Sequence, residues 1–277
     1  MSAPLRLFHI AYSGETAAAL PPGFELLDNL ANPRPDWYEY APVRRFLLEE
    51  PLDERTFYGF FSPKFTAKTG HTHADVAALV QRHGAAVDVL LFSAHANQIA
   101  FFLNVFEQGE FFHRGLLDAA RGWLAAAGIG VDPAALVMDV RQIVYCNFFV
   151  ARPAFWRRWL ALGETLYALC EGTASPPRPE LQRQLTTATD YRGAAQMKIF
   201  LMERIASLLL AIEPQWRSVA ADPYAKGLWP NEALRRDPTD AIVSDALKLA
   251  LRQQPQWSEY ASAFGSLRRR ILQGVAR

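Results

Sequence analysis

Short apolar runs alternate with helical patterns over the first part of the chain. Four runs are rich in aromatic and β-branched residues and predict strands, at residues 7–12, 57–61, 87–92 and 142–150. Between the second and third runs, residues 72–80 have apolar positions at helical spacing, and Thr72 and Asp75 match an N-terminal capping pair. A strand, helix and strand in this order favour parallel pairing of the two strands.

Longer apolar stripes at helical spacing occupy the rest of the chain. They predict helices at residues 98–108, 115–127, 153–171, 194–212, 239–253 and 257–272. Three prolines break the pattern at residues 172–179, and little strand signal follows them. We therefore expect an α/β body over residues 1–171, with a mostly parallel central sheet flanked by helices. A helical C-terminal part over residues 180–277 should pack on the same domain.

Prolines dominate the segment between residues 21 and 51. Because proline lacks an amide proton, the only long regular element expected there is residues 43–50. The segment also holds Trp37, Tyr38 and Tyr40, whose rings need burial, so we expect an ordered excursion rather than a loose loop.

Composition narrows the possible classes of protein. Lys and Arg total 29 against 28 for Asp and Glu, so no global field draws the chain to nucleic acid. Cys146 and Cys170 both lie in apolar runs, which indicates free thiols in a reducing compartment. No apolar stretch approaches the roughly 18 residues of a membrane span, and the N-terminal apolar run is too short for an export signal. These features predict a cytoplasmic protein.

The common sequence signatures of enzymes are missing. The chain has no G-x-G-x-x-G, G-x-x-x-x-G-K-[ST], G-x-S-x-G, H-E-x-x-H or C-x-x-C motif. The pair His71 and His73 has a spacing that a metal could use, but two histidines in a polar turn favour surface positions, and we expect no metal site there.

Polar residues follow three of the predicted strands, at residues 12–16, 62–70 and 93–98. In an open α/β sheet the ligand crevice lies outside the carboxyl ends of the strands, so these loops could form one site. Alternatively, their Ser, Thr and Asn side chains only cap the helices that follow. Both interpretations stay open from the sequence.

Charged and amide side chains suggest further site residues. Lys64 and Lys68, with the amides near residues 69–70, suit a pyrophosphate unless they only face solvent. Asn147 lies in an apolar run and needs either backbone partners or a ligand such as a sugar hydroxyl. Glu203 and Arg204 interrupt an apolar helix, as an internal ion pair or with the carboxylate presented to the crevice.

Five segments taken together resemble a known family. They are residues 7–13, Asp28-Asn29 with 36–47, 58–65, 145–150 and 197–206. Spread over about two hundred residues, they are similar to uncharacterised glycosyltransferase-like proteins encoded with bacterial surface-polysaccharide genes, such as those for capsule or O-antigen. Their order resembles the GT-A pattern of an N-terminal strand, a strand leading to the donor site, an Asn-aromatic acceptor strand and a late Phe-Leu-x-Glu-Arg helix.

The resemblance implies a GT-A-like, Rossmann-like sheet in an enzyme that transfers a sugar from a nucleotide-sugar donor to a glycan or lipid-linked glycan acceptor. The implied donor-binding residues are Ser13, Arg44, Ser62, Lys64, Lys68, His95 and Asn97. Asn147 and Tyr191 are implied to meet the acceptor or sugar hydroxyls, and the candidate catalytic base is Glu39 or Glu203. Arg45 adjoins Arg44, and because neighbouring helical side chains point about 100° apart, at most one of the two should reach a ligand.

The sequence departs from the GT-A pattern in one respect. Typical members hold a divalent ion with an Asp-x-Asp motif, and this chain has no carboxylate-x-carboxylate triplet. We therefore expect no cofactor, and no metal held by such a motif. Positive charge from Lys64, Lys68 or Arg44 would then stabilise the departing nucleoside diphosphate.

Other functions remain open from the sequence. A non-catalytic carbohydrate-binding or assembly protein would also lack the triplet and use the many aromatic residues for sugar stacking. A hydrolase built on Ser62 or Ser93 with His95 is a third alternative, although neither serine has the glycines of a nucleophile elbow. The arginines at positions 268–270 either contact the inner face of a membrane weakly or are only solvated.

Overall fold

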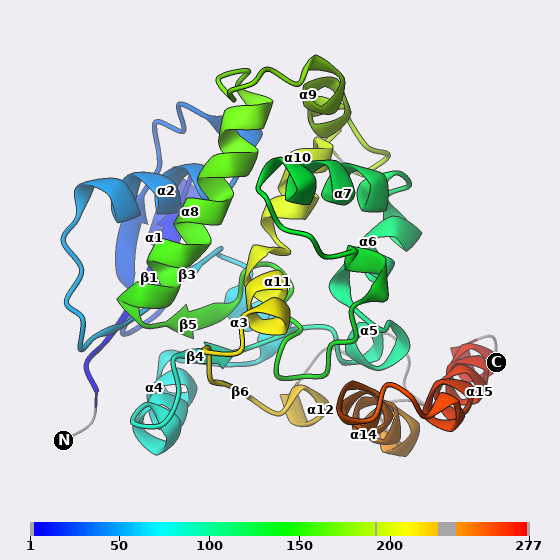
Figure 1. Ribbon diagram of the computed structural model, residues 1–277. Coiled ribbons are helices and arrows are strands. Elements are labelled where there is room, and N and C mark those ends of the chain that lie inside the picture. The colour runs from blue at the N-terminus through cyan, green and yellow to red at the C-terminus, as the bar shows by residue number, and fades with distance from the viewer. Residues whose placement is uncertain (1–2, 192, 227–236, 276–277) are drawn as a thin grey trace.

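The fold is a six-stranded sheet with helices on both faces (Figure 1). The computed structural model describes residues 3–191, 193–226 and 237–275 of the 277. The strands are β1 (Leu5–Ala11), β2 (Glu25–Asp28), β3 (Phe57–Phe61), β4 (Val89–Leu91), β5 (Phe149–Ala151) and β6 (Ser218–Ala220). Their order across the sheet is β2-β1-β3-β5-β4-β6.

Most neighbouring strands are parallel, as the sequence predicts. β1 is parallel to β2 and β3, and β4 is parallel to β6. β5 lies between β3 and β4 and is antiparallel to both. The predicted direct pairing of β3 with β4 is therefore wrong, although the two strands run in the same direction. Their carboxyl ends, and that of β1, meet at the same edge of the sheet.

Fourteen helices are described around the sheet. They are α1 (Gly14–Ala18), α2 (Tyr40–Glu49), α3 (Phe65–Thr69), α4 (His73–His83), α5 (Ala96–Phe101), α6 (Val105–Phe112), α7 (Leu116–Ala126), α8 (Pro153–Cys170), α9 (Pro179–Thr186), α10 (Met197–Met202), α11 (Ile205–Ile212), α12 (Pro223–Lys226), α14 (Thr239–Gln253) and α15 (Ser258–Val275). Among the described helices, none has both the length and the apolar content of a membrane span.

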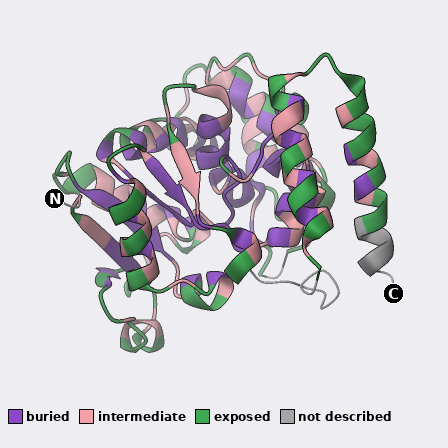
Figure 2. Ribbon diagram, turned by 90° about the horizontal axis from the view of Figure 1, so that it is seen from below, coloured by how far each residue is buried: buried purple, intermediate pink, exposed green. Residues whose placement is uncertain are grey.

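Two hydrophobic cores cover the two faces of the sheet. The larger core packs α2, α7, α8, α10 and α11 together, and the indole of Trp156 in α8 donates a 2.9 Å hydrogen bond to the carbonyl of Tyr58 in β3. The smaller core joins α3 and α4 to the other face. Figure 2 shows buried residues along the strands and on the inward sides of the helices, whereas α15 lies at the periphery. Burial on both faces explains why β3 has an uninterrupted apolar sequence.

Local sequence signals set several helix ends as predicted. Thr72 accepts a hydrogen bond from the amide of Asp75, whose carboxylate accepts one from the amide of Thr72, so the predicted capping pair of α4 is confirmed. Pro153 occupies the first turn of α8, and α7 ends before Gly128, which has φ of +73°. Of the three rings expected to be buried, Trp37 and Tyr40 are buried, but Tyr38 is 41% exposed.

Other element boundaries differ from the prediction. The single helix predicted for 98–108 is two helices, because the Asn104 side chain accepts hydrogen bonds from two amides and starts α6. The helix predicted for 194–212 is interrupted between α10 and α11 at Glu203 and Arg204. The strand predicted for 142–150 begins only at Phe149. Short strands β2 and β6 have no clear sequence signal and were not predicted.

The region before β5 is a turn rather than a strand. Cys146 and Asn147 have φ of +59° and +51°, in the left-handed region, and Asn147 therefore does not lie inside a ladder. The serine hydroxyls of Ser93 and Ser207 hold this turn, because they bond to the backbone of Ile143 and Val144. The predicted free state of the two cysteines is confirmed, with Cys170 buried and Cys146 partly buried.

The C-terminal part is not purely helical, because β6 completes one edge of the sheet. α14 packs against α5 through a small apolar cluster that includes Ala100 and Ala241, and through buried polar side chains. The ammonium of Lys248 donates to the carbonyls of Ile99 and Phe102, at 2.5 and 3.4 Å. The hydroxyl of Ser244 donates to the carbonyl of Ala100. These bonds satisfy carbonyls at the end of α5 that have no partner within that helix.

Candidate functional site

A cavity of about 980 Å³ opens at the carboxyl ends of the central strands. Tyr12 follows β1, Ser62 follows β3 and His95 follows β4, and all three line this cavity. The three loops therefore meet at one cavity, which is one of the two interpretations that the sequence left open. The volume and position match those of ligand sites in open α/β folds.

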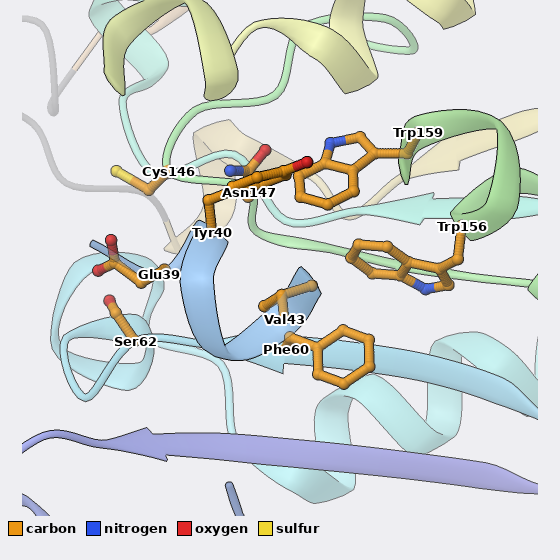
Figure 3. A pocket seen from close by; sticks show the side chains of 9 residues that line it. All are labelled: Glu39, Tyr40, Val43, Phe60, Ser62, Cys146, Asn147, Trp156 and Trp159. Atoms are coloured by element: carbon orange, nitrogen blue, oxygen red, sulfur yellow. The ribbon is translucent and has the colours of Figure 1, made fainter. Parts of the chain in front are cut away.

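A second, much smaller cavity continues from the first. It has a volume of about 10 Å³, close to what one water molecule needs, and it shares Glu39, Ser62 and Cys146 with the large cavity. Figure 3 shows these three side chains on one side of it and the rings of Trp156 and Trp159 on the other.

Two buried polar atoms of the small cavity have no hydrogen-bond partner among the residues that the structure describes. They are the side-chain oxygen of Asn147 and the indole nitrogen of Trp159. One is a hydrogen-bond acceptor and the other a donor. Asn147 therefore lines the small cavity and not the large one.

Glu203 lies in the cavity wall at the break between α10 and α11. Its carboxylate accepts no hydrogen bond from any residue that the structure describes. Burial raises its pKa to about 7, since a charged carboxylate is poorly solvated there. The charge of Arg204 opposes this increase, and the Glu39 carboxylate adds to it. Glu203 therefore titrates near neutral pH, as a general base in an enzyme should.

Lys68 supplies positive charge beside Glu203. Its ammonium lies 3.1 Å from the Cys146 sulfur and 5.9 Å from the centre of the Phe148 ring. Burial alone would lower its pKa, but Cys146 and Glu203 outweigh burial and raise the pKa. Lys64, one turn earlier, is exposed and also lines the cavity. Two cations therefore flank the end of β3.

Two histidines in the cavity wall are neutral at physiological pH. Burial and the charge of Lys68 lower the pKa of His95. Burial and the charge of Arg204 lower the pKa of His113 to about 4. Burial raises the pKa of the Cys146 thiol to about 12, so this cysteine is protonated and a poor nucleophile.

Aromatic rings surround the cavity and remain accessible to solvent. Tyr12, Tyr38, Phe112 and Tyr191 are each between 41% and 56% exposed and all line the cavity. Exposed rings in a concave site provide faces on which sugars and nucleobases stack.

Most of the site residues predicted from the sequence lie together. Those that line the large cavity are Glu39, Ser62, Lys64, Lys68, His95, Tyr191 and Glu203. Asn147 lines the small cavity next to it. Ser13, Arg44 and Asn97 line neither cavity.

The three outlying residues have other surroundings. The Ser13 hydroxyl accepts a hydrogen bond from the amide of Thr16 and caps α1, the alternative that the sequence left open. The Arg44 guanidinium donates two hydrogen bonds of 2.6 and 2.7 Å to Glu164, which neutralises its charge away from the cavity. Asn97 is partly buried in α5.

The prediction missed several lining residues, among them Asn29, Asn32, Gln98, Gln108, His113, Tyr145 and Arg204. The sequence signal that could have identified such lining residues was a polar side chain inside an apolar segment of the chain. The sequence predicts a role for Arg204 only as the partner of Glu203, but no ion pair joins them among the described residues. Its charge instead interacts with neutral oxygens of α6 and α10.

The site does not contain the arrangement of a serine hydrolase. Ser93 donates its hydroxyl to the carbonyl of Ile143 at 2.5 Å, and no hydrogen bond of the described chain joins His95 to Ser62 or Ser93. Over residues 3–191, 193–226 and 237–275, no group of three His, Cys, Asp or Glu side chains could hold a metal ion, so His71 and His73 form no such cluster. No family model, curated protein or solved structure matches this chain.

Proposed function

We propose that this protein is a glycosyltransferase-like enzyme of the GT-A type, which transfers a sugar from a nucleotide-sugar donor to a bacterial surface glycan. One observation carries the proposal. The cavity at the strand ends combines two lysines with the Glu203 carboxylate, whose pKa is raised to about 7. The mostly parallel sheet and the sequence resemblance support the same assignment.

Each part of the cavity has a role in this reaction. Lys64 and Lys68 bind the diphosphate of the donor and stabilise the charge that develops on it as the anomeric C–O bond breaks. The acceptor hydroxyl forms the new bond to the anomeric carbon and gives its proton to Glu203. Glu39, which also lines the cavity, raises the basicity of Glu203 by repulsion rather than acting as the base.

Nucleoside diphosphates test the donor site directly. The full-length chain is heated with a panel of them, and we expect the matching nucleotide to raise the melting temperature. Lys68→Met should weaken nucleotide binding by about ten-fold, because a charge-assisted contact is lost. Lys226→Met is the matched control, since Lys226 pairs with Asp75 and does not line the cavity.

Two results would contradict the donor site. One is the absence of stabilisation by any nucleoside diphosphate or nucleotide sugar. The other is equal loss of nucleotide affinity in Lys68→Met and Lys226→Met, which would place the bound nucleotide outside the cavity.

A non-catalytic carbohydrate-binding or assembly protein is the second candidate. The accessible rings of Tyr12, Tyr38, Phe112 and Tyr191 favour it, because such rings bind sugars without any catalysis. Stabilisation by glycans together with no response to nucleotides would select this function. Sugar release from a nucleotide sugar in the presence of an acceptor would exclude it.

A further inference from the structure

Arg204 is a buried cation in the cavity wall without an anionic partner. It is 4% exposed, and no carboxylate of the described residues lies within ion-pair distance of its guanidinium. It donates hydrogen bonds to the carbonyls of Val105 and Phe200, at 2.7 and 2.5 Å, and to the side-chain oxygen of Gln108 at 2.5 Å. A guanidinium carries five N–H groups, so these bonds do not exhaust its donors.

The neighbouring helix makes room for this side chain. Gly109 lies within α6, where glycine weakens a helix by about 1 kcal/mol relative to alanine. A methyl group at this position would lie 2.7 Å from two nitrogens of Arg204. The glycine therefore lets the guanidinium pack against the α6 backbone and keeps it in the cavity wall.

Two further polar atoms near Arg204 are buried and have no hydrogen-bond partner in the described part of the chain. They are the hydroxyl of Tyr145, a residue that is 7% exposed, and the Nδ1 atom of His113. Both residues line the same cavity. Burial raises the pKa of Tyr145, although the charge of Arg204 opposes this increase, whereas burial and the charge of Arg204 together lower the pKa of His113. Buried donors without partners are rare unless a ligand or water completes them.

We propose that Arg204, Tyr145 and His113 form a subsite for an anionic oxygen group of a ligand, either a phosphate or a carboxylate. The guanidinium supplies the charge, and the tyrosine hydroxyl and the neutral imidazole, in the tautomer that carries its proton on Nδ1, supply donors. This inference goes beyond the proposed function, since the subsite would bind an anion whatever reaction the cavity supports. The anion belongs either to the nucleotide donor or to an acidic sugar on the acceptor side.

The experiment measures binding of four probes to the full-length chain by calorimetry: inorganic phosphate, a nucleoside diphosphate, glucuronate and glucose. Glucose is the neutral control for glucuronate. The main variant is Tyr145→Phe, which removes only an oxygen atom and leaves the ring in place. We expect it to weaken binding of the anion that occupies the subsite by about ten-fold and to leave glucose binding unchanged.

Tyr40→Phe is the matched control. Tyr40 is equally buried, but its hydroxyl donates to Glu164 at 2.7 Å. It should bind all four probes like the unchanged protein. Selective loss of glucuronate affinity in Tyr145→Phe would assign the subsite to an acidic acceptor, and selective loss of nucleotide affinity would assign it to the donor.

Two outcomes would overturn the proposal. One is that neither phosphate, the nucleotide nor glucuronate binds more tightly than glucose. The other is that Tyr145→Phe binds each anion as tightly as the unchanged protein. The Lys68→Met variant separates the two proposals, because a lost donor site at Lys68 would still leave glucuronate binding at Arg204 intact.

Discussion

Two regions of this protein that hold buried or partly buried charged groups differ in what surrounds those groups. Where α14 packs against the body, the Asp139 side chain is 2% exposed and receives Arg141 and Arg252 at 2.7 and 2.6 Å. In the cavity wall, the Glu203 carboxylate accepts no hydrogen bond from any described residue. No described carboxylate forms an ion pair with the Arg204 guanidinium. In the first region the charged groups pair with one another, as they do in contacts that stabilise a fold. In the second region the charged groups are not paired with one another and can interact with a ligand, which is typical of functional sites.

The prediction with the largest expected effect concerns Glu203, the proposed catalytic base in the cavity wall. Glu203→Gln keeps the shape of the side chain but cannot accept a proton, so the rate of sugar transfer should fall by about 10²- to 10⁴-fold. In the unchanged protein, the proposed role predicts a rate that rises with pH through about 7, because Glu203 is a base only when it is ionised. Steady-state rates between pH 5.5 and 8.5 measure both effects.

Two results would contradict this role of Glu203. One is a variant that retains more than a tenth of the activity, and the other is a rate that falls as pH rises through 7. Glu39→Gln is the comparison variant, and it should reduce the rate less than Glu203→Gln does.

The next largest effect is expected on the stability of the protein when Asp139 is substituted. Asp139→Ala should lower the free energy of unfolding by about 2–3 kcal/mol, because two arginines and the amide of Arg141 lose their shared acceptor. Urea unfolding followed by fluorescence measures the change. Asp118→Ala is the control: Asp118 pairs with Arg121 on the surface, where the loss should stay below about 0.5 kcal/mol. Equal losses of unfolding free energy in the two variants would contradict the distinction between the buried charge pairs of Asp139 and the surface pair of Asp118.

The smallest effect compares two buried tyrosines. Tyr40→Phe should lower the free energy of unfolding by about 1–2 kcal/mol, because Glu164 loses a hydrogen bond from the hydroxyl. Tyr145→Phe should leave stability unchanged or increase it by up to about 1 kcal/mol, since the hydroxyl that it removes has no partner. A larger loss in Tyr145→Phe than in Tyr40→Phe would mean that the hydroxyl of Tyr145 has a structural role.

Local sequence signals were sufficient for much of the fold and for part of the site. The aromatic run of β3, the capping pair of α4 and the proline at the start of α8 each act through neighbouring residues, so a short window predicts them. The position of Ser62, Lys68 and His95 at one cavity follows from the rule that parallel strands end at the same edge.

The tertiary structure alone decided the rest. β5 enters between β3 and β4 through long-range pairing, which no local pattern specifies. The same holds for Arg44, which Glu164 binds across 120 residues of sequence, and for Arg204, which packs on Gly109 in another helix. The sequence by itself determined which side chains could carry charge. Burial and the choice of partner, which depend on packing between distant segments, determined which of them remain free to act.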